Sequence, residues 1–352
     1  MRLHEHHAAS VRPGDRGRAI GAAFAEQIRL VSRLYGEFFA TAGVGADTVA
    51  SVAADSQAAL ARWSPELAAE LEGIAEGAGL PLAAVTLLDG RTEIMAHLPP
   101  SAEGECSTMV FNPGGVAPQT MQTWDWHEEL APEGLLLSGR GSSGLRFKLF
   151  TEFGVLGKIG LNEAGLGVHF NILSHASDGS GTGVPVHAIA RRVIEEATSV
   201  EEAIALARSA PVSASTVLTV VARGRSVSIE LSPRRTAVIE QGADGWLLHT
   251  NHFLDAELSG EDTIPVVESS TELRLDYLAG LRDRLAGQEP AERAKIVSGK
   301  GAAPVIMRPD TTLPVTEQWR TLLTIALHTA EFSMSYFPGD PQEAGDNGFL
   351  VC

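Results

Sequence analysis

Cysteine is scarce in this sequence. Only Cys106 and Cys352 occur among 352 residues, so a zinc site built from several thiolates is excluded. A scaffold held by many disulfides is excluded for the same reason. One bridge between the two cysteines is conceivable, but so low a count is typical of a reducing compartment.

Long apolar runs are also missing. No stretch of about 18 or more consecutive apolar residues occurs, so no membrane span is expected. The first residues, Met1 to His7, lack the apolar core of a secretory signal, and we expect a cytoplasmic protein. With 27 Lys and Arg against 44 Asp and Glu, the formal net charge of −17 argues against nucleic acid and anionic membranes as partners.

What is present is an ordinary globular balance, with 44% hydrophobic and 20% charged residues. The first hundred residues are predicted to be helical, because apolar residues recur every three or four positions from Ile20 to Phe38 and from Leu60 to Ile74. The second pattern is predicted to split at Ser64-Pro65 into two helices, since serine caps a helix and proline suits its first turn.

A different pattern begins after the helical part. Residues 97–105 contain two prolines, small residues and acids without periodicity, which predicts a loop. Short strand-like runs separated by glycine or proline follow, with helical patterns at 186–210 and 268–286. The predicted strands are 107–111, 120–126, 134–138, 165–173, 215–222, 226–231, 236–240, 246–250 and an extended region at 322–336. This order predicts a layered α+β fold with antiparallel sheets.

Cys106 lies where the predicted loop meets the first predicted strand. A lone cysteine is usually a small buried hydrophobe, and that explanation applies to any single one. However, Asp125 follows 19 residues later between Trp124 and Trp126. Side chains alternate along a strand, so the two tryptophans face one side and Asp125 the other. Asp125 is either an exposed acid or a partner of Cys106 on the neighbouring strand.

Two further segments carry polar residues at strand ends. In one, Asn251 ends an apolar strand between His249 and His252. Its amide could donate to an oxyanion, or it could simply stabilise the following turn. In the other, residues 160–172 form a hairpin pattern that contains Asn171 and Ile172, and alone it indicates nothing more than a hairpin.

Together these segments resemble the acyl-coenzyme A:6-aminopenicillanic-acid acyltransferase family, also called isopenicillin N acyltransferases, of the N-terminal nucleophile hydrolases. The likeness extends over residues 14–341. Four blocks in this order carry it: 71–82 with Asp89-Gly90-Arg91-Thr92-Glu93; Cys106-Ser107-Thr108 with 122–126; 162–171 with 183–187; and His249-Thr250-Asn251-His252.

The resemblance implies an αββα four-layer sandwich and a chain that cleaves itself between Glu105 and Cys106. Residues 1–105 would become a helical small chain, and residues 106–352 a catalytic chain, together one folded unit. Cys106 would be the nucleophile of both cleavage and catalysis. By the same resemblance, Asp125 matches the acid near the new amino terminus and Asn251 the oxyanion amide. The backbone N–H near Asn171 and Ile172 would be a second donor.

Some positions depart from the family pattern or are supporting candidates. Glu105 stands where glycine usually precedes the cysteine, and Thr123 where asparagine is common before Trp124. An arginine near the C-terminus matters in related hydrolases, and Arg320 is the candidate here. Trp124 and His252 are further supporting candidates.

Self-cleavage has a chemical rationale. A thiol with a pKa of about 8.5 is only a few per cent thiolate at neutral pH, whereas an α-amine titrates near about 8. Freed by cleavage, the amine of Cys106 could serve as base and then as acid. The expected partner is a small-molecule amide substrate, with no metal or organic cofactor, and a homo-oligomer is compatible with the sequence.

Two other functions stay open on the sequence. A conventional Cys–His hydrolase would use His249 or His252 as base and would never cleave itself. A catalytically silent binding protein could keep the fold without the reaction, and Glu105 in place of glycine is compatible with that reading.

Overall fold

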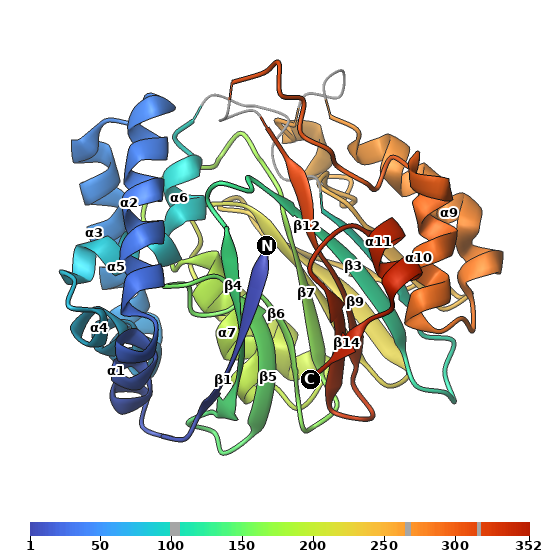
Figure 1. Cartoon of the computed structure of the whole chain (residues 1–352), viewed down its shortest axis with the longest axis horizontal. Helices are drawn as coiled ribbons and strands as arrows, with labels where there is room; N and C mark the ends of the chain where they lie inside the picture. Colours follow the sequence, from blue (N-terminus) through green and yellow to red (C-terminus); the bar gives the residue numbers. More distant parts are fainter. Residues whose placement is uncertain (99–105, 265–268, 315–317) are drawn as a thin grey trace.

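Two β-sheets stacked face to face form the centre of the computed structural model, with helices on both outer sides (Figure 1). The structure describes residues 1–98, 106–264, 269–314 and 318–352. The first sheet has the strand order β1-β4-β5-β6-β7-β8-β9-β10, and the second β11-β2-β3-β12-β13-β14. All neighbouring strands are antiparallel except β1 and β4, which are parallel.

The strands of the first sheet are β1 (Arg2–Ala8), β4 (Glu133–Arg140), β5 (Arg146–Thr151), β6 (Ile159–Asn162), β7 (Gly167–Ile172), β8 (Thr216–Ala222), β9 (Arg225–Leu231) and β10 (Thr236–Glu240). Those of the second sheet are β2 (Ser107–Phe111), β3 (Gln119–Trp126), β11 (Trp246–His249), β12 (Arg320–His328), β13 (Ser333–Phe337) and β14 (Leu350–Val351).

Eight helices lie on the side of the first sheet: α1 (Pro13–Ala23), α2 (Ala25–Thr41), α3 (Ala46–Trp63), α4 (Pro65–Ala78), α5 (Leu82–Asp89), α6 (Arg91–Met95), α7 (Val186–Glu196) and α8 (Val200–Ser209). The second sheet is covered by α9 (Thr271–Leu285), α10 (Pro290–Ser298) and α11 (Pro341–Asn347). The two sheets and two helical layers confirm the predicted αββα sandwich. None of the helices within the described residues combines the length and apolar character needed to cross a membrane.

The helical prediction for the first hundred residues needs one correction. Residues 2–8 form β1, which pairs with β4 along its full length. From His4 to Ala8 its side chains alternate between less and more exposed positions, and three of these five residues are histidines rather than typical strand residues. The predicted split at Ser64-Pro65 is confirmed: the Ser64 hydroxyl caps α4 by accepting from the backbone N–H of Leu67.

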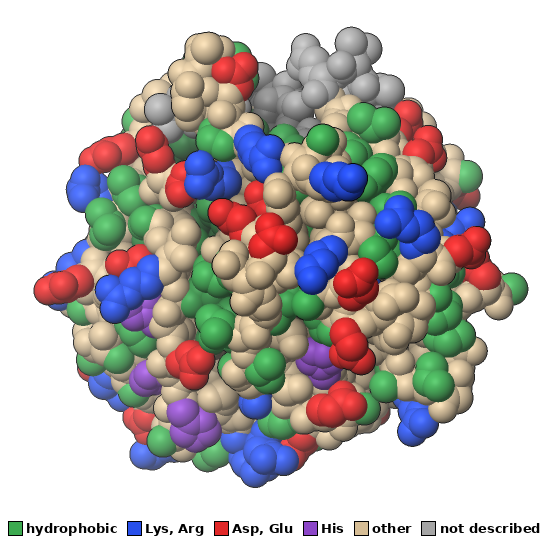
Figure 2. Space-filling view, turned by 45° about the vertical axis from the view of Figure 1, so that its right-hand side comes forward, with side chains coloured by type: hydrophobic (Ala, Val, Ile, Leu, Met, Phe, Trp, Pro, Cys, Tyr) green, Lys and Arg blue, Asp and Glu red, His purple; other side chains and the backbone are tan. Residues whose placement is uncertain are grey.

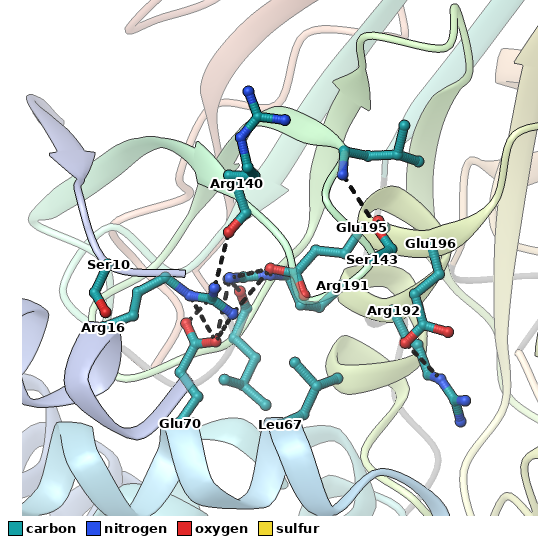
Figure 3. A network of polar contacts seen from close by, with 12 residues as sticks. Ser10, Arg16, Leu67, Glu70, Arg140, Ser143, Arg191, Arg192, Glu195 and Glu196 are labelled. Atoms are coloured by element: carbon teal, nitrogen blue, oxygen red, sulfur yellow. Dashed lines mark hydrogen bonds and ion pairs between the residues drawn. The ribbon is translucent and has the colours of Figure 1, made fainter. Parts of the chain in front are cut away.

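Helices α1 and α4 approach each other closely because glycines line their contact. A Cβ at Gly17 or Gly21 would overlap the backbone of α4, and a Cβ at Gly73 or Gly77 would overlap that of α1. This close approach lets Arg16 of α1 reach the neighbouring buried acids, which Figure 3 shows. At the surface, acidic and basic side chains are interspersed with apolar ones over the face presented in Figure 2.

Candidate active site

Cys106 directly precedes β2, at the edge of the space between the two sheets. Ser107 pairs with Thr123 on β3, which brings the start of β2 beside the end of β3. The Cys106 thiol is free and only 3% exposed, and its Sγ lies 3.9 Å from the main-chain oxygen of Asp125. The structure therefore brings Cys106 and Asp125 together on neighbouring strands.

The main chain of Cys106 is held from two other elements. Its carbonyl oxygen accepts from Asn171 Nδ2 at 3.1 Å and from Arg274 Nη1 at 2.7 Å. Arg274, on α9, also donates to Ser107 Oγ at 3.0 Å and to Asn251 Oδ1 at 3.1 Å. One buried guanidinium thus links Cys106 to Asn251, the amide predicted to bind an oxyanion.

The side chain of Asn171 is oriented by contacts across the two sheets. Its Oδ1 accepts from Thr108 Oγ1 at 2.7 Å and from Gln122 Nε2 at 3.3 Å, both on the second sheet. With its oxygen fixed in this way, its Nδ2 points to Cys106. The resemblance implied a role for the backbone near Asn171, whereas the contact with Cys106 that the structure shows is made by the Asn171 side chain.

Asn251 follows β11 and is completely buried. Its Nδ2 donates to the main-chain oxygen of Ile172 at 2.9 Å, and its own backbone N–H donates to Thr271 Oγ1 at 2.8 Å. Because an amide nitrogen carries two hydrogens, the bond to Ile172 leaves one more available. Asn171 and Ile172 of β7 and Asn251 after β11 thus come from two segments, and Arg274 links Asn251 to Cys106.

The two histidines of the alternative Cys–His mechanism are engaged elsewhere. His249 Nε2 lies 2.9 Å from Glu230 Oε1, and both side chains are buried. His252 Nδ1 lies 2.9 Å from Thr271 Oγ1 at the start of α9. Among the described residues, neither histidine has a hydrogen bond to Cys106.

The electrostatic surroundings of Cys106 disfavour its thiolate form. Burial, and then the charge of Asp125, raise the pKa of Cys106 to about 12. The cations of Lys158 and Arg274 act in the opposite direction. A group of three or more His, Cys, Asp or Glu side chains placed to hold a metal ion is not found within the described part of the chain.

Comparison with known proteins places these residues in a family. Residues 113–292 match the model of the family described as acyl-coenzyme A:6-aminopenicillanic acid acyl-transferase. The chain belongs to this acyltransferase family. The resemblance drawn from the sequence motifs is thereby confirmed.

One curated relative is the 40 kDa form of acyl-coenzyme A:6-aminopenicillanic-acid-acyltransferase of Emericella nidulans, 31% identical over 222 residues. The match covers 62% of this chain and 60% of the relative, so less than two thirds of that protein is represented. Among solved structures, penicillin V acylase from Agrobacterium tumefaciens has a TM-score of 0.40 at 14% identity, covering 66% of this chain and 83% of that one. A conjugated bile acid hydrolase mutant from Clostridium perfringens has a TM-score of 0.45 at 13% identity, covering 70% and 95%.

The segment matched by the acyltransferase family includes most of the assembled site. Asp125, Asn171, Asn251 and Arg274 all lie inside residues 113–292, whereas Cys106 lies before its first residue. The assignment of Cys106 to the site therefore depends on the geometry described above.

Two supporting candidates from the sequence, Arg320 and Trp124, lie in different surroundings. Arg320 is half-exposed at the start of β12 and pairs with Glu128, with Nε 3.1 Å from Oε2, and the arginine that contacts Cys106 is Arg274. Trp124 is buried, with its ring nearly parallel to that of Trp126, as the strand alternation predicted. The predicted cleavage site at Glu105 lies outside the described residues.

Two residues of the site were not predicted. Arg274 occupies a position of the buried stripe of α9, with Thr271 and Leu278, so an arginine on an apolar helix face was the signal that could have found it. Lys158 is 1% exposed between the sheets, with its Nζ 4.2 Å from the centroid of the Trp124 ring and 2.7 Å from Glu152 Oε2. Neither residue belongs to a linear motif that marks a nucleophile.

Proposed function

We propose that this chain is a self-processing cysteine hydrolase or acyltransferase that cleaves the amide bond of a small N-acylated amine or amino-acid conjugate. The observation that carries the proposal is that Asn171 and Arg274 both donate to the carbonyl oxygen of Cys106, while Arg274 also holds Asn251. Membership of the acyltransferase family supports the same reaction class.

In the first half of the proposed reaction, Cys106 Sγ attacks the carbonyl carbon of Glu105. The C–N bond breaks, the acyl group passes to sulfur as a thioester, and the nitrogen takes a proton to become the free amine of Cys106. Water then hydrolyses the thioester, which leaves chains 1–105 and 106–352. Asp125, buried beside Cys106, is suited to hold the new ammonium group.

In the second half, the mature thiolate attacks a substrate amide and the amine of Cys106 transfers the proton to the leaving group. The free hydrogen of Asn251 Nδ2 and the backbone N–H of Ile172 are the proposed oxyanion donors. One such donor contributes roughly 3–4 kcal/mol to transition-state stabilisation. Water or a second amine resolves the thioester, which gives hydrolysis or acyl transfer.

Cleavage would not separate the two chains. Strand β1 of the first chain is paired with β4 of the second along seven residues. The buried ion pairs of Arg16 and Glu70 with Glu195 and Arg191 also cross between the chains. We therefore propose that residues 1–105 and 106–352 stay one folded unit. Two free cysteines suit the cytoplasmic location that we propose.

The test is the intact mass of the purified protein under denaturing conditions, for the wild type and for Cys106→Ala. We expect two fragments in the wild type, with Cys106 as the new N-terminus, and one uncut chain in the variant. The cleaved wild type should then release amine from a panel of small amides and show a mass increase when an electrophilic amide analogue acylates Cys106. An uncut wild type with full amidase activity would contradict the proposal and favour the Cys–His mechanism.

A further inference from the structure

A cavity of about 250 Å³ lies next to the proposed oxyanion site. The two share Ile172, which lines the cavity and whose carbonyl oxygen accepts from Asn251. On one side the cavity is walled by Thr92 and Met95 of α6 and by Ala96 directly after it, which follow the spacing of a single helix face. Its volume is at the low end for small-molecule sites, so its ligand is small.

The cavity has an acid at one end. Asp178 lines it, and its carboxylate is held in place by Ser215 Oγ, which donates to Oδ1 at 2.6 Å, and by the backbone N–H of His175, which donates to Oδ2 at 2.9 Å. Within the described residues, no lysine, arginine or histidine side chain forms an ion pair with Asp178. The negative charge is thus positioned by neutral groups and left without a counter-ion.

A second acid strengthens the negative field at this end. Asp262 accepts from the backbone N–H groups of Phe253 and Ile264, each at 2.9 Å, and Ile264 lines the cavity. Burial, with a contribution from Asp262, raises the pKa of Asp178 to about 6, and burial also raises that of Asp262. His175 does not neutralise them, because burial lowers its pKa. A bound cation would relieve this repulsion.

A buried hydroxyl on the cavity wall also lacks a partner. Thr92 is 5% exposed, and its Oγ1 has no hydrogen-bond partner among the described residues. Buried polar atoms are nearly always paired, so an unpaired one on a cavity wall indicates a missing ligand or water. Thr92 and Asp178 together offer a hydroxyl and a carboxylate in a space otherwise bordered by Met95, Leu173 and Ile264.

We propose that this cavity selects amide substrates that carry a small ammonium group, with Asp178 as the counter-ion. The short apolar part of such a substrate lies along Met95 and Leu173, and the scissile amide lies at the Ile172 end, near Asn251. This inference rests on the proposed function and narrows its substrate class.

The test uses two pairs of amides that match in size and differ in one charge. β-Alanyl and propionyl anilides place the charge on the acyl half, while N-acetylethylenediamine and N-propylacetamide place it on the amine half. We expect the charged member of at least one pair to have a kcat/KM on the order of tenfold higher at neutral pH. Asp178→Asn should bring that ratio close to one, because it removes the charge and keeps the shape.

Two variants separate charge from structure. Glu261→Gln removes an exposed acid next to Asp262 that does not line the cavity, and it should leave the ratio unchanged. Ser215→Ala removes one hydrogen bond to Asp178 and keeps the charge, so the ratio should persist. If Ser215→Ala abolished the preference as fully as Asp178→Asn, the carboxylate would be a structural group and the inference would be wrong.

The binding step can be tested apart from the chemistry. The Cys106→Ala chain is expected to stay uncut and inactive, so calorimetry on it can compare the binding of N-acetylethylenediamine with that of N-propylacetamide. Preferential binding of the charged amide without any turnover by the wild type would keep this inference and overturn the proposed function. Turnover and binding that both ignore the charge would overturn the inference and leave the proposed function standing.

Discussion

Two clusters of buried charges differ in how their charges balance. In the first, Arg16 and Arg191 face Glu70 and Glu195, so two cations meet two carboxylates (Figure 3). In the second, Arg91 and Lys158 both form ion pairs with Glu152. Burial raises the pKa of the neighbouring carboxyls of Asp89 and Glu93 to about 7 and about 8, which favours their neutral forms. Only the second cluster includes a cation that acts on Cys106.

The balanced cluster links helices and neighbouring segments of the fold to one another. Arg16 and Glu70 come from α1 and α4, Arg191 comes from α7, and Arg191 Nη1 also donates to the main-chain oxygen of Leu156 at 2.8 Å. Arg16 donates to the main-chain oxygen of Arg140 at 3.1 Å. Nearly every charged group of this cluster is therefore paired with a group of opposite charge or with a main-chain carbonyl. Buried ions need such partners, because an unpaired buried charge is strongly destabilising.

The unbalanced cluster instead relies on aromatic rings. Lys158 lies over Trp124, and the Arg91 guanidinium lies 4.9 Å from the ring centroid of Trp126. Among the described residues, Arg91 Nε and Nη1 have no hydrogen-bond partner. Ring faces attract cations more weakly than a carboxylate does, so a positive field remains. The comparison indicates that a cluster with balanced charges stabilises the fold, whereas a cluster with an excess of positive charge can stabilise an anion.

The largest loss of stability is expected from removing one charge of the balanced cluster. Arg16→Met leaves Glu70 and Glu195 with one guanidinium, and removing one partner of a buried ion pair costs about 3–5 kcal/mol. The measurement is urea unfolding on a Cys106→Ala background, which keeps the chain in one piece. Met at this position retains most of the arginine stem, so a loss below about 1 kcal/mol would mean that the cluster contributes little to stability.

The matching change in the unbalanced cluster should act on chemistry. Lys158→Met leaves Glu152 with Arg91, one charge of each sign, so we expect stability to stay the same or to rise. Self-cleavage should slow by roughly tenfold or more, because each unit of increase in the thiol pKa lowers the thiolate fraction tenfold. Cleavage is followed by intact mass after cell-free synthesis.

Lys158→Arg is the control for this substitution. It keeps the positive charge in place, so it should restore most of the cleavage rate that Lys158→Met loses. A Lys158→Met chain that cleaves at the wild-type rate would show that the cation has no influence on Cys106.

The difference between the two clusters also explains which parts of the structure could be predicted from the sequence. The layered α+β order and the strands around Cys106 and Asp125 follow from local periodicity, whereas the αββα sandwich was implied by the family resemblance that the motifs carry. Arg274 and Lys158 could not be placed in this way, because they reach the site from α9 and from the segment before β6. Their roles depend on which distant elements pack together, and a buried cation and an exposed one look alike in a sequence.

The pH dependence of stability should distinguish the clusters further. Burial lowers the pKa of Lys158 to about 8 from an ordinary value of 10.5. Between these values the unfolded chain holds a proton that the folded chain has lost, so this group makes stability rise with pH. On the Cys106→Ala background, stability measured from pH 8 to 10 should rise relative to Lys158→Met, by at most about 1.4 kcal/mol per pH unit. Parallel curves for the two proteins would contradict a depressed pKa for Lys158.

The smallest effect is expected from a charge pair at the surface. Arg320 and Glu128 are each about half-exposed, at 48% and 47%, and such pairs contribute about 0–1 kcal/mol. Arg320→Ala should therefore leave both the unfolding free energy and the rate of self-cleavage close to those of the wild type.

Arg274→Met provides the matched comparison, because it removes the guanidinium that holds the Cys106 carbonyl and Asn251, and cleavage should nearly stop. If Arg320→Ala blocked cleavage while leaving stability intact, the surface pair would have to act on the nucleophile at some stage of the reaction. The arginine required for cleavage would then be Arg320, as expected from the resemblance. Burial next to Cys106 would not identify the arginine that cleavage requires.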